Sequence, residues 1–238
     1  MRTQKSAPHN IKQDWKFVKE LQSPLHTEIR LDRTQKGSGE ASLGCGVSLD
    51  FRFPDDGRLA TAYADFKQFL RAAGIDASGP YKITTEKVRT GSFESYKVEV
   101  AEGSCRILAG DTEGIRRAHV FLEDEIMRSG GPFLKTGRYK RRPFIKTRIS
   151  RCFFGPIKRP PLNRDELTDN VDYYPEEYLN RLAHESVNGL WLTIQFSDLC
   201  PSIFFPSHAR ERMRRFDKLN KTIEKCARYG IKIYAFCI

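Results

Sequence analysis

Two apolar runs near the end of the chain constrain its fold most strongly. Residues Gly189 to Phe196 (GLWLTIQF) and Ile231 to Ile238 (IKIYAFCI) are almost continuously apolar and have the length of strands. A strand with one face in water alternates apolar and polar residues, so these runs indicate strands covered on both faces, as in a parallel sheet. Between them, four apolar residues share one face of a predicted helix: Phe216, Leu219, Ile223 and Cys226.

A third strand and a second helix are predicted just before these runs. Phe144 to Phe154 (FIKTRISRCFF) is strand-like, and Pro175 opens a helix that continues through Val187 with acidic residues in its first turn. Three parallel strands joined by two helical crossovers begin either a doubly wound sheet or a (β/α)8 barrel. A barrel needs about 250 residues, far more than residues 141 to 238 supply. We therefore expect a fragment of a longer protein.

The earlier part of the chain predicts a different architecture. Cys45 to Phe53 alternates like a strand with one buried face, and Arg58 to Ala73 has the spacing of an amphipathic helix that Gly74 closes. Three more short strands are predicted at Tyr81–Val88, Ser95–Val100 and Cys105–Leu108. A second helix follows, capped by Asp111 or Thr112, with an apolar stripe of Ile115, Ala118, His119, Leu122 and Ile126. This order suits a small α+β layer with two helices on one sheet face.

The predicted fold class is therefore α/β, with a small α+β domain before an unfinished set of β/α units. We divide the chain into a polar segment (1–40), an α+β domain (41–140) and a part with the first three strands of a (β/α)8 barrel (141–238). The boundary is set in the basic stretch Thr136 to Arg142.

Composition excludes several classes of protein. With 39% hydrophobic residues among 238, the chain can build a core and is not disordered as a whole. Its longest apolar runs fall far short of the roughly 20 residues of a membrane-spanning helix, and its first residues lack the apolar region of a secretory signal. We expect no membrane partner and a cytoplasmic location. The six cysteines form no CxxC pair, which favours reduced thiols.

The net charge of +11 permits nucleic-acid binding but does not specify it. The basic clusters are short, at Arg138–Arg142 and Arg210–Arg215, and no zinc finger, aromatic RNA-binding pattern or heptad accompanies them. A solvated basic face is the simpler interpretation. Nucleic acid is therefore the least favoured partner.

The histidines do not match a metal-binding motif. His184 and Glu185 begin an HExxH pattern, but Asn188 stands where the second histidine would be, so no metal is predicted and His184 is expected on a helix surface. His119 has Glu123 four residues later and is interpreted as structural. No GxSxG elbow or phosphate-binding glycine loop occurs.

Candidate binding residues come from where barrel enzymes place them, at the carboxyl ends of the strands. The positions there are Arg148, Ser150 and Arg151 for the first strand, and Gln195, Ser197 and Asp198 for the second. Arginines at such a mouth can donate several hydrogen bonds to sugar hydroxyls or to carboxylates. Trp191, inside its strand, is assigned to the core rather than to a sugar-stacking platform. Ion pairing beneath the loops is an equal alternative for the arginines.

One family shares this succession of segments. The helix-opening segment GDTEGIRRAHVFLEDEI, the basic link RYKRRPF, the strand RISRCFF and the units PEEYLNRLAHESVNGLWL and KLNKTIEKCARYGIKIYAF resemble glycoside hydrolase family 20 over about residues 40 to 238. The resemblance implies a zincin-like domain without zinc, followed by a (β/α)8 barrel that removes terminal N-acetylhexosamine. It also implies a sugar-binding arginine at the first barrel strand, which would be Arg148 or Arg151.

The chain departs from that family at its second strand, where Trp191, Leu192 and Thr193 replace a His-x-His and Asp198 is a single acid. The family's catalytic Asp-Glu pair follows the fourth strand, so it would lie beyond Ile238. We therefore expect no catalytic residue and no cofactor in this chain, a glycan as substrate, and Arg148, Arg151 and Asp198 as substrate-binding candidates. A carbohydrate-binding or interaction module without catalysis remains the main alternative.

Overall fold

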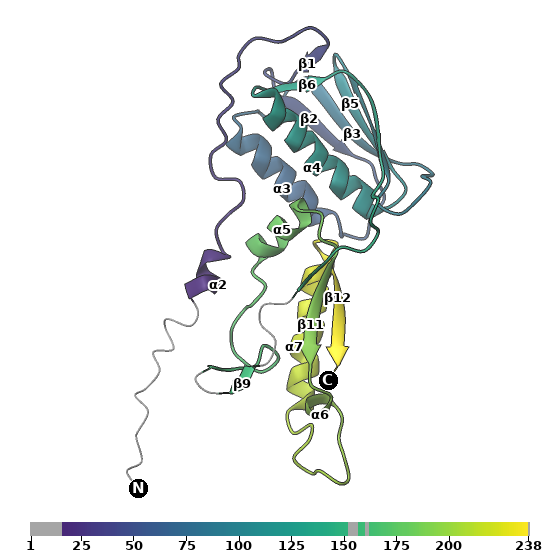
Figure 1. The fold of residues 1–238 in the computed structure, drawn as a ribbon. Coiled ribbons are helices and arrows are strands. Elements are labelled where there is room, and N and C mark those ends of the chain that lie inside the picture. The colour runs from purple at the N-terminus through teal and green to yellow at the C-terminus, as the bar shows by residue number, and fades with distance from the viewer. Residues whose placement is uncertain (1–15, 152–156, 160–161, 238) are drawn as a thin grey trace.

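The computed structural model describes residues 16–151, 157–159 and 162–237, which form two sheet-based units in succession (Figure 1). The first unit contains a five-stranded sheet with the spatial order β2-β3-β5-β4-β7. Its strands are β2 (Val47–Phe51), β3 (Tyr81–Lys87), β4 (Tyr96–Ala101), β5 (Ser104–Ala109) and β7 (Gly137–Arg141). β2, β3 and β5 are parallel, whereas β4 runs antiparallel to β5 and β7. The four strands predicted between residues 45 and 108 are thus confirmed, each within a few residues.

The basic stretch that was expected to separate two domains is part of this sheet. β7 pairs with β4 along its whole length, with Val98 opposite Tyr139 and Glu99 opposite Arg138. Its side chains are half-buried or exposed. Lysine and arginine on an edge strand discourage pairing with other chains, which gives this basic segment a physical role. Where the boundary between the two domains lies therefore stays a prediction.

Two helices cover one face of the sheet, as predicted (Figure 1). They are α3 (Ala60–Ala72) and α4 (Thr112–Ser129). Asp111 caps α4, because its carboxylate accepts a hydrogen bond from the Gly114 amide at 2.8 Å. Gly74 and Gly130 follow the two helices with φ of 69° and 67°, a left-handed conformation that glycine adopts without strain.

His119 lies on the buried stripe of α4. Its Nδ1 donates to the Ile115 carbonyl at 3.0 Å, and its ring packs edge-on against Phe51, Tyr63 and Phe66. Its Nε2 has no hydrogen-bond partner among the described residues. Burial lowers the pKa of His119 to about 4, because the apolar surroundings disfavour the charged imidazolium.

The second unit contains a three-stranded parallel sheet with the order β12-β11-β8. Its strands are β8 (Ile149–Arg151), β11 (Gly189–Ile194) and β12 (Lys232–Cys237). Helix α5 (Glu176–His184) precedes β11, and α6 (Phe196–Leu199) and α7 (Arg212–Ala227) lie between β11 and β12. This confirms the mixed α/β class and the predicted strand-helix alternation. No closed barrel forms within the described residues.

The first strand of this unit is shorter than expected. The pattern predicted Phe144–Phe154, but β8 begins only at Ile149, and residues 152–154 lie outside the described residues. Phe144 is fully exposed and Ile145 largely so. The pairing explains the start, because β8 meets β11 from Gly189 onward and β11 offers no earlier partner residue.

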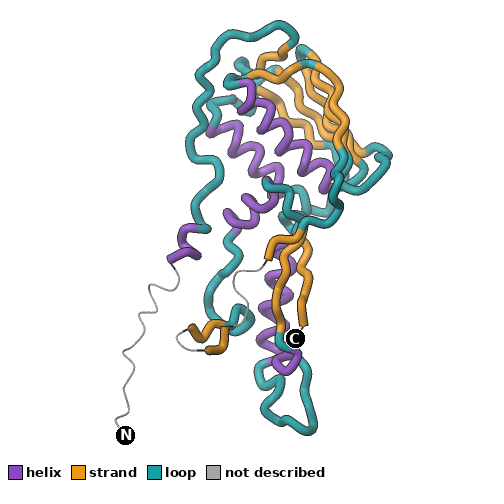
Figure 2. The backbone as a smooth tube through the Cα atoms, viewed as in Figure 1, coloured by secondary structure: helices purple, strands orange, loops and turns teal. Residues whose placement is uncertain are grey.

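Short elements that the sequence did not indicate complete the fold. β1 (Glu40–Ser42) pairs antiparallel with β6 (Phe133–Lys135), and β9 (Ile157–Arg159) pairs with β10 (Leu162–Arg164). Helix α2 (Lys16–Glu20) precedes an extended loop (Figure 2). Each pairing spans only three residues, too few for a periodic pattern.

Each unit has its own apolar core. The first core contains Phe66, Ile83 and Leu122, and the second contains Leu179, Leu192 and Ile231. The segment before residue 40 contacts both, since Ile29 and Leu31 pack on the first core while Val18 belongs to the second.

Four cysteines whose side chains the structure describes, Cys45, Cys105, Cys200 and Cys226, are free thiols. No helix among the described residues is long and apolar enough to span a membrane.

Candidate functional site

The carboxyl ends of the three parallel strands meet at one edge of the second sheet. Gly189 of β11 is level with Ile149 and Lys232, and Trp191 is level with Arg151 and Tyr234. In α/β enzymes the ligand-binding groups gather at this edge. Trp191, which the sequence assigned to the core, is only half-buried and packs edge-on against Phe236 at 5.3 Å between ring centroids.

Arg148 lies at the opposite edge, just before β8. Its backbone amide donates to Asn188 Oδ1 at 2.8 Å, and its Nε donates to the Ser186 carbonyl at 2.5 Å. Its Nη2 donates to Glu94 Oε2 at 2.5 Å, and the Glu94 carboxylate is almost wholly buried in the first unit. Arg148 therefore joins the two units through an ion pair.

Asn188 strengthens the same junction. Its Nδ2 donates to Glu94 Oε1 at 3.0 Å and to the Lys146 carbonyl at 2.8 Å. The residue that breaks the HExxH pattern thus has a structural role of its own. A neutral imidazole could not fill it, because the Asn188 amide donates two hydrogen bonds and accepts one, whereas the imidazole has a single N–H donor.

Asp198 lies in α6, directly after β11, as predicted. Its Oδ2 is 3.7 Å from Nη1 of Arg215, which also pairs with Asp165 at 2.6 Å. The carboxylate is about one-fifth exposed. Arg148 and Asp198 lie toward opposite ends of β11, so the structure does not bring them together. The backbone of Arg151 belongs to β8, while its side chain lies outside what the structure describes.

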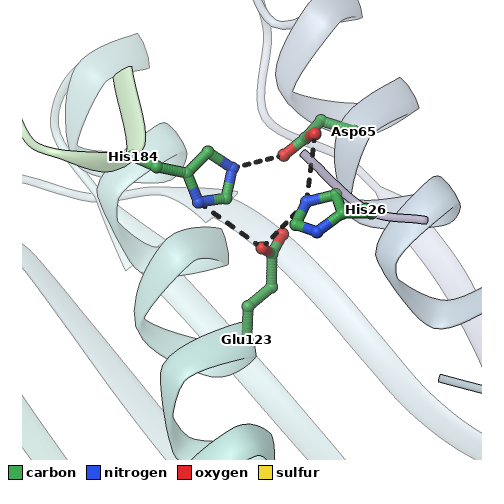
Figure 3. A group of neighbouring side chains, drawn as sticks. All are labelled: His26, Asp65, Glu123 and His184. Atoms are coloured by element: carbon green, nitrogen blue, oxygen red, sulfur yellow. Dashed lines mark hydrogen bonds and ion pairs between the residues drawn. The ribbon is translucent and has the colours of Figure 1, made fainter. Parts of the chain in front are cut away.

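The structure brings together four other residues that the sequence did not group (Figure 3). His26 comes from the loop after α2, Asp65 from α3, Glu123 from α4 and His184 from the end of α5. One ligand atom from each lies within 4.8 Å of the others. We call these four residues the junction cluster.

Short contacts connect the junction cluster (Figure 3). His184 Nε2 donates to Asp65 Oδ2 at 2.7 Å, and its Nδ1 is 3.7 Å from Glu123 Oε2. His26 Nε2 is 3.2 Å from Asp65 Oδ1 and 3.5 Å from Glu123 Oε2. All four side chains are at most 16% exposed. His184 is therefore largely buried against the first unit, and its predicted place on a helix surface is wrong.

The pKa values of the two carboxyl groups in the cluster are shifted in opposite directions. Burial alone would raise the pKa of Asp65, but the adjacent imidazoles of His184 and His26 outweigh it and hold that pKa well below its usual range. Burial raises the pKa of Glu123 well above its usual range, and the nearby Asp65 carboxylate adds to the shift. Proton uptake is therefore easier at Glu123 than at Asp65.

Sequence patterns give only a faint signal for this cluster. His26 and His184 lie 158 positions apart, and no two of the four residues lie within one motif. Glu123 lies four residues after His119, on the same buried face of the helix. A carboxylate on a buried face needs a polar partner, so this position alone could have indicated a site.

No protein-family model and no curated protein matches this sequence. Solved structures do match. A GH138 enzyme targeting the pectin rhamnogalacturonan II superposes with a TM-score of 0.60 and 16% identity, over 80% of this chain and 24% of that one. A β-N-acetylhexosaminidase from Bacteroides fragilis gives 0.55 and 12%, over 88% and 44%. The GH20 chitobiase of Flavobacterium johnsoniae gives 0.54 and 13%, over 85% and 32%.

At these identities the matches show a shared fold. The chain spans less than half the length of each of these three structures. The chain therefore shares its fold with domains of glycoside hydrolases from more than one family, without assignment to one of them.

Proposed function

We propose that this chain is part of a carbohydrate-active glycoside hydrolase, acting on a terminal N-acetylhexosamine or a related sugar. The observation that carries the proposal is the succession of a helix-covered sheet and parallel β/α units, which superposes on glycoside hydrolases over at least 80% of the chain. In this proposal the first unit (41–140) is a zincin-like accessory domain, and residues 141–238 supply the first three strands of a (β/α)8 barrel.

The surface of the second unit supports an unfinished barrel. Within the described residues β12 pairs with β11 alone, yet Tyr234 and Phe236 on it are 38% and 47% exposed. Phe216 and Ile223 on α7 are exposed to a similar extent. Apolar side chains on an open sheet edge and a neighbouring helix are what further β/α units would cover.

For substrate binding, we propose Arg151 rather than Arg148 as the sugar-binding arginine. Arg151 lies at the third position of β8, toward the carboxyl end, whereas the Arg148 guanidinium is bound to Glu94 and to backbone carbonyls at the other end. Asp198 follows β11 at the carboxyl edge and completes the proposed mouth. A guanidinium and a carboxylate at a barrel mouth can each hydrogen-bond sugar hydroxyls.

In this proposal the chain lacks the pair of carboxylic acids that hydrolysis requires. Glycosidases use a pair of carboxylic acids around the scissile bond, and Asp198 is the single acid directly after a barrel strand in the described residues. The catalytic pair would follow a fourth strand.

The test is an assay of the purified 238-residue chain with aryl N-acetylhexosaminides, beside a known hexosaminidase in the same buffer. The proposal predicts no turnover by the chain alone. Turnover that a hexosaminidase inhibitor abolishes would overturn the proposed inactivity. Titration of N-acetylglucosamine oligomers into the wild type and R151A distinguishes the alternative: tight, Arg151-dependent binding without turnover would favour a binding module complete in itself.

A further inference from the structure

We propose that the junction cluster is a binding site for a divalent transition metal ion, Zn²⁺ above all, with His26, Glu123 and His184 as ligands and Asp65 as the residue that orients them. The inference concerns a site away from the proposed sugar-binding edge and does not depend on the glycosidase proposal. It rests on the donor set, its spacing, its burial and two buried atoms that lack partners.

The donor set suits zinc. Two imidazoles and one or two carboxylates are ligands that zinc takes in proteins, at about 2.0–2.2 Å. Around a tetrahedral ion, that bond length places neighbouring donor atoms about 3.3 Å apart. The distances from Glu123 Oε2 to His26 Nε2 and to His184 Nδ1 are 3.5 and 3.7 Å. Small side-chain shifts would close this set around one ion.

Two atoms in the cluster lack the partners that buried polar atoms normally have. Glu123 Oε1 and His26 Nε2 are buried, and neither has the geometry of a hydrogen bond to any described residue, although carboxylate oxygens lie close to His26. The Glu123 side chain is 5% exposed and that of His26 is 9% exposed. Burying such atoms without a partner costs free energy. An ion bound by His26 Nε2 gives that atom a partner, and Glu123 Oε1 gains one when the carboxylate binds the ion through both oxygens.

The tautomer of His184 favours the same arrangement. Its Nε2–H is donated to Asp65 Oδ2, which leaves the Nδ1 lone pair directed toward Glu123. Asp65 is itself fixed, because Asn180 donates to its Oδ1 at 2.5 Å. A carboxylate that accepts the second N–H of a ligand histidine is a frequent feature of zinc sites.

The charges balance as well. Two carboxylates lie in a site whose side chains are at most 16% exposed, where negative charge needs a compensating cation. A divalent cation neutralises them.

The position of the site gives it a consequence for the fold. Its ligands come from the loop after α2, from α4 in the first unit and from α5 in the second (Figure 3). A bound ion would therefore connect the two units and the segment before them. A role in holding these elements together fits a site with all its donors on rigid helices or a packed loop.

The test uses the tag-free 238-residue chain after treatment with a chelator, titrated with ZnCl₂ by calorimetry and with Co²⁺ by visible absorption. We expect one Zn²⁺ per chain with a Kd in the micromolar range or below, a Co²⁺ spectrum of four-coordinate nitrogen and oxygen ligation, and a higher Tm with Zn²⁺. E123Q and H184N should weaken binding at least 100-fold. H208N, which changes a histidine stacked on Phe205 outside the cluster, should leave it unchanged.

Two outcomes would overturn the proposal. One is the absence of Zn²⁺ binding by the wild type. The other is equal binding by wild type, E123Q and H184N, which would place the ion elsewhere. If circular dichroism shows that H184N does not fold, N180A provides the second variant: loss of the donor to Asp65 should weaken Zn²⁺ binding about 10- to 100-fold, and unchanged binding would contradict the assigned role of Asp65.

Discussion

The two sheets of this molecule differ in how completely they are covered. In the first unit, α3 and α4 bury one face, while the other face carries charged side chains such as Arg106, which pairs with Glu86 and Glu99 at 3.0 Å. Its edge strand β7 is basic. In the second unit, β11 is buried almost throughout, yet its neighbour β12 exposes aromatic residues at the edge.

The difference shows which strand faces in each unit are suited to contact water and which are suited to contact further protein. The strands of the first unit alternate, as in β4, because one face meets water. The strands of the second unit are apolar on both faces, although the structure covers β12 only in part. An apolar strand with exposed side chains implies a partner surface, and the proposal of further β/α units supplies one.

The largest expected effect comes from comparing one aromatic residue in each unit. Phe66 is fully buried in the first core, whereas Phe236 on β12 is 47% exposed. F66A should lower the free energy of unfolding by about 3–5 kcal/mol, and F236A by less than about 1 kcal/mol. Urea unfolding followed by circular dichroism measures both. Equal losses of unfolding free energy in F66A and F236A would contradict the difference between the units, since they would mean that β12 is covered in solution.

Burial of His119 in the first core should make stability depend on pH. The native pKa of His119 is about 4, below the ordinary 6.5, so as the pH falls from 6.5 to 4 the unfolded chain takes up a proton that the native protein does not. Stability should therefore fall across this window, by on the order of 3 kcal/mol for this group.

The control for that effect is H119F, which suits the aromatic surroundings of the site. Its stability should fall less steeply between pH 6.5 and 4 than that of the wild type. Parallel pH profiles for the two proteins would show that His119 is not the group responsible.

The ion pair between the units should matter less than the core. R148A leaves the buried Glu94 carboxylate without its 2.5 Å partner, although Arg117 remains 3.8 Å from it. We expect a loss of about 2–3 kcal/mol in the free energy of unfolding. E94Q/R148A should lose less than the sum of its single changes, and strict additivity would argue against a coupled pair.

The smallest effect belongs to the exposed face of the first sheet. R106A removes the guanidinium that lies between Glu86 and Glu99, and that side chain is 49% exposed. The expected loss is below about 1 kcal/mol and should shrink further in high salt. A salt-independent loss above about 2 kcal/mol, measured by urea unfolding at two salt concentrations, would mean that this face is covered.

Local patterns predicted most of the fold, because strand and helix periodicities report which face of each element is buried. The α4 stripe, the Asp111 cap and the strands β2 to β5 all follow from them. The short β1–β6 pair and the late start of β8 did not, since those depend on partners far away in the chain.

In the candidate sites, too, local positions could be predicted from the sequence, whereas contacts between distant residues could not. The place of Asp198 after β11 could be read from the sequence, but the engagement of Arg148 with Glu94 could not, because the partner lies 54 residues away in another unit. The junction cluster was missed for the same reason. His184 looked like an exposed helical residue because the helix pattern says nothing about the second unit packing on the first.

The measurement that tests the central claim most directly is the intact mass of the endogenous protein, captured with an antibody against the first unit. If the second unit is the beginning of a larger barrel, the mass will be well above the 27.4 kDa of this chain. A mass of 27.4 kDa would contradict the account, because the exposed edge at β12 would then have to be covered by another molecule.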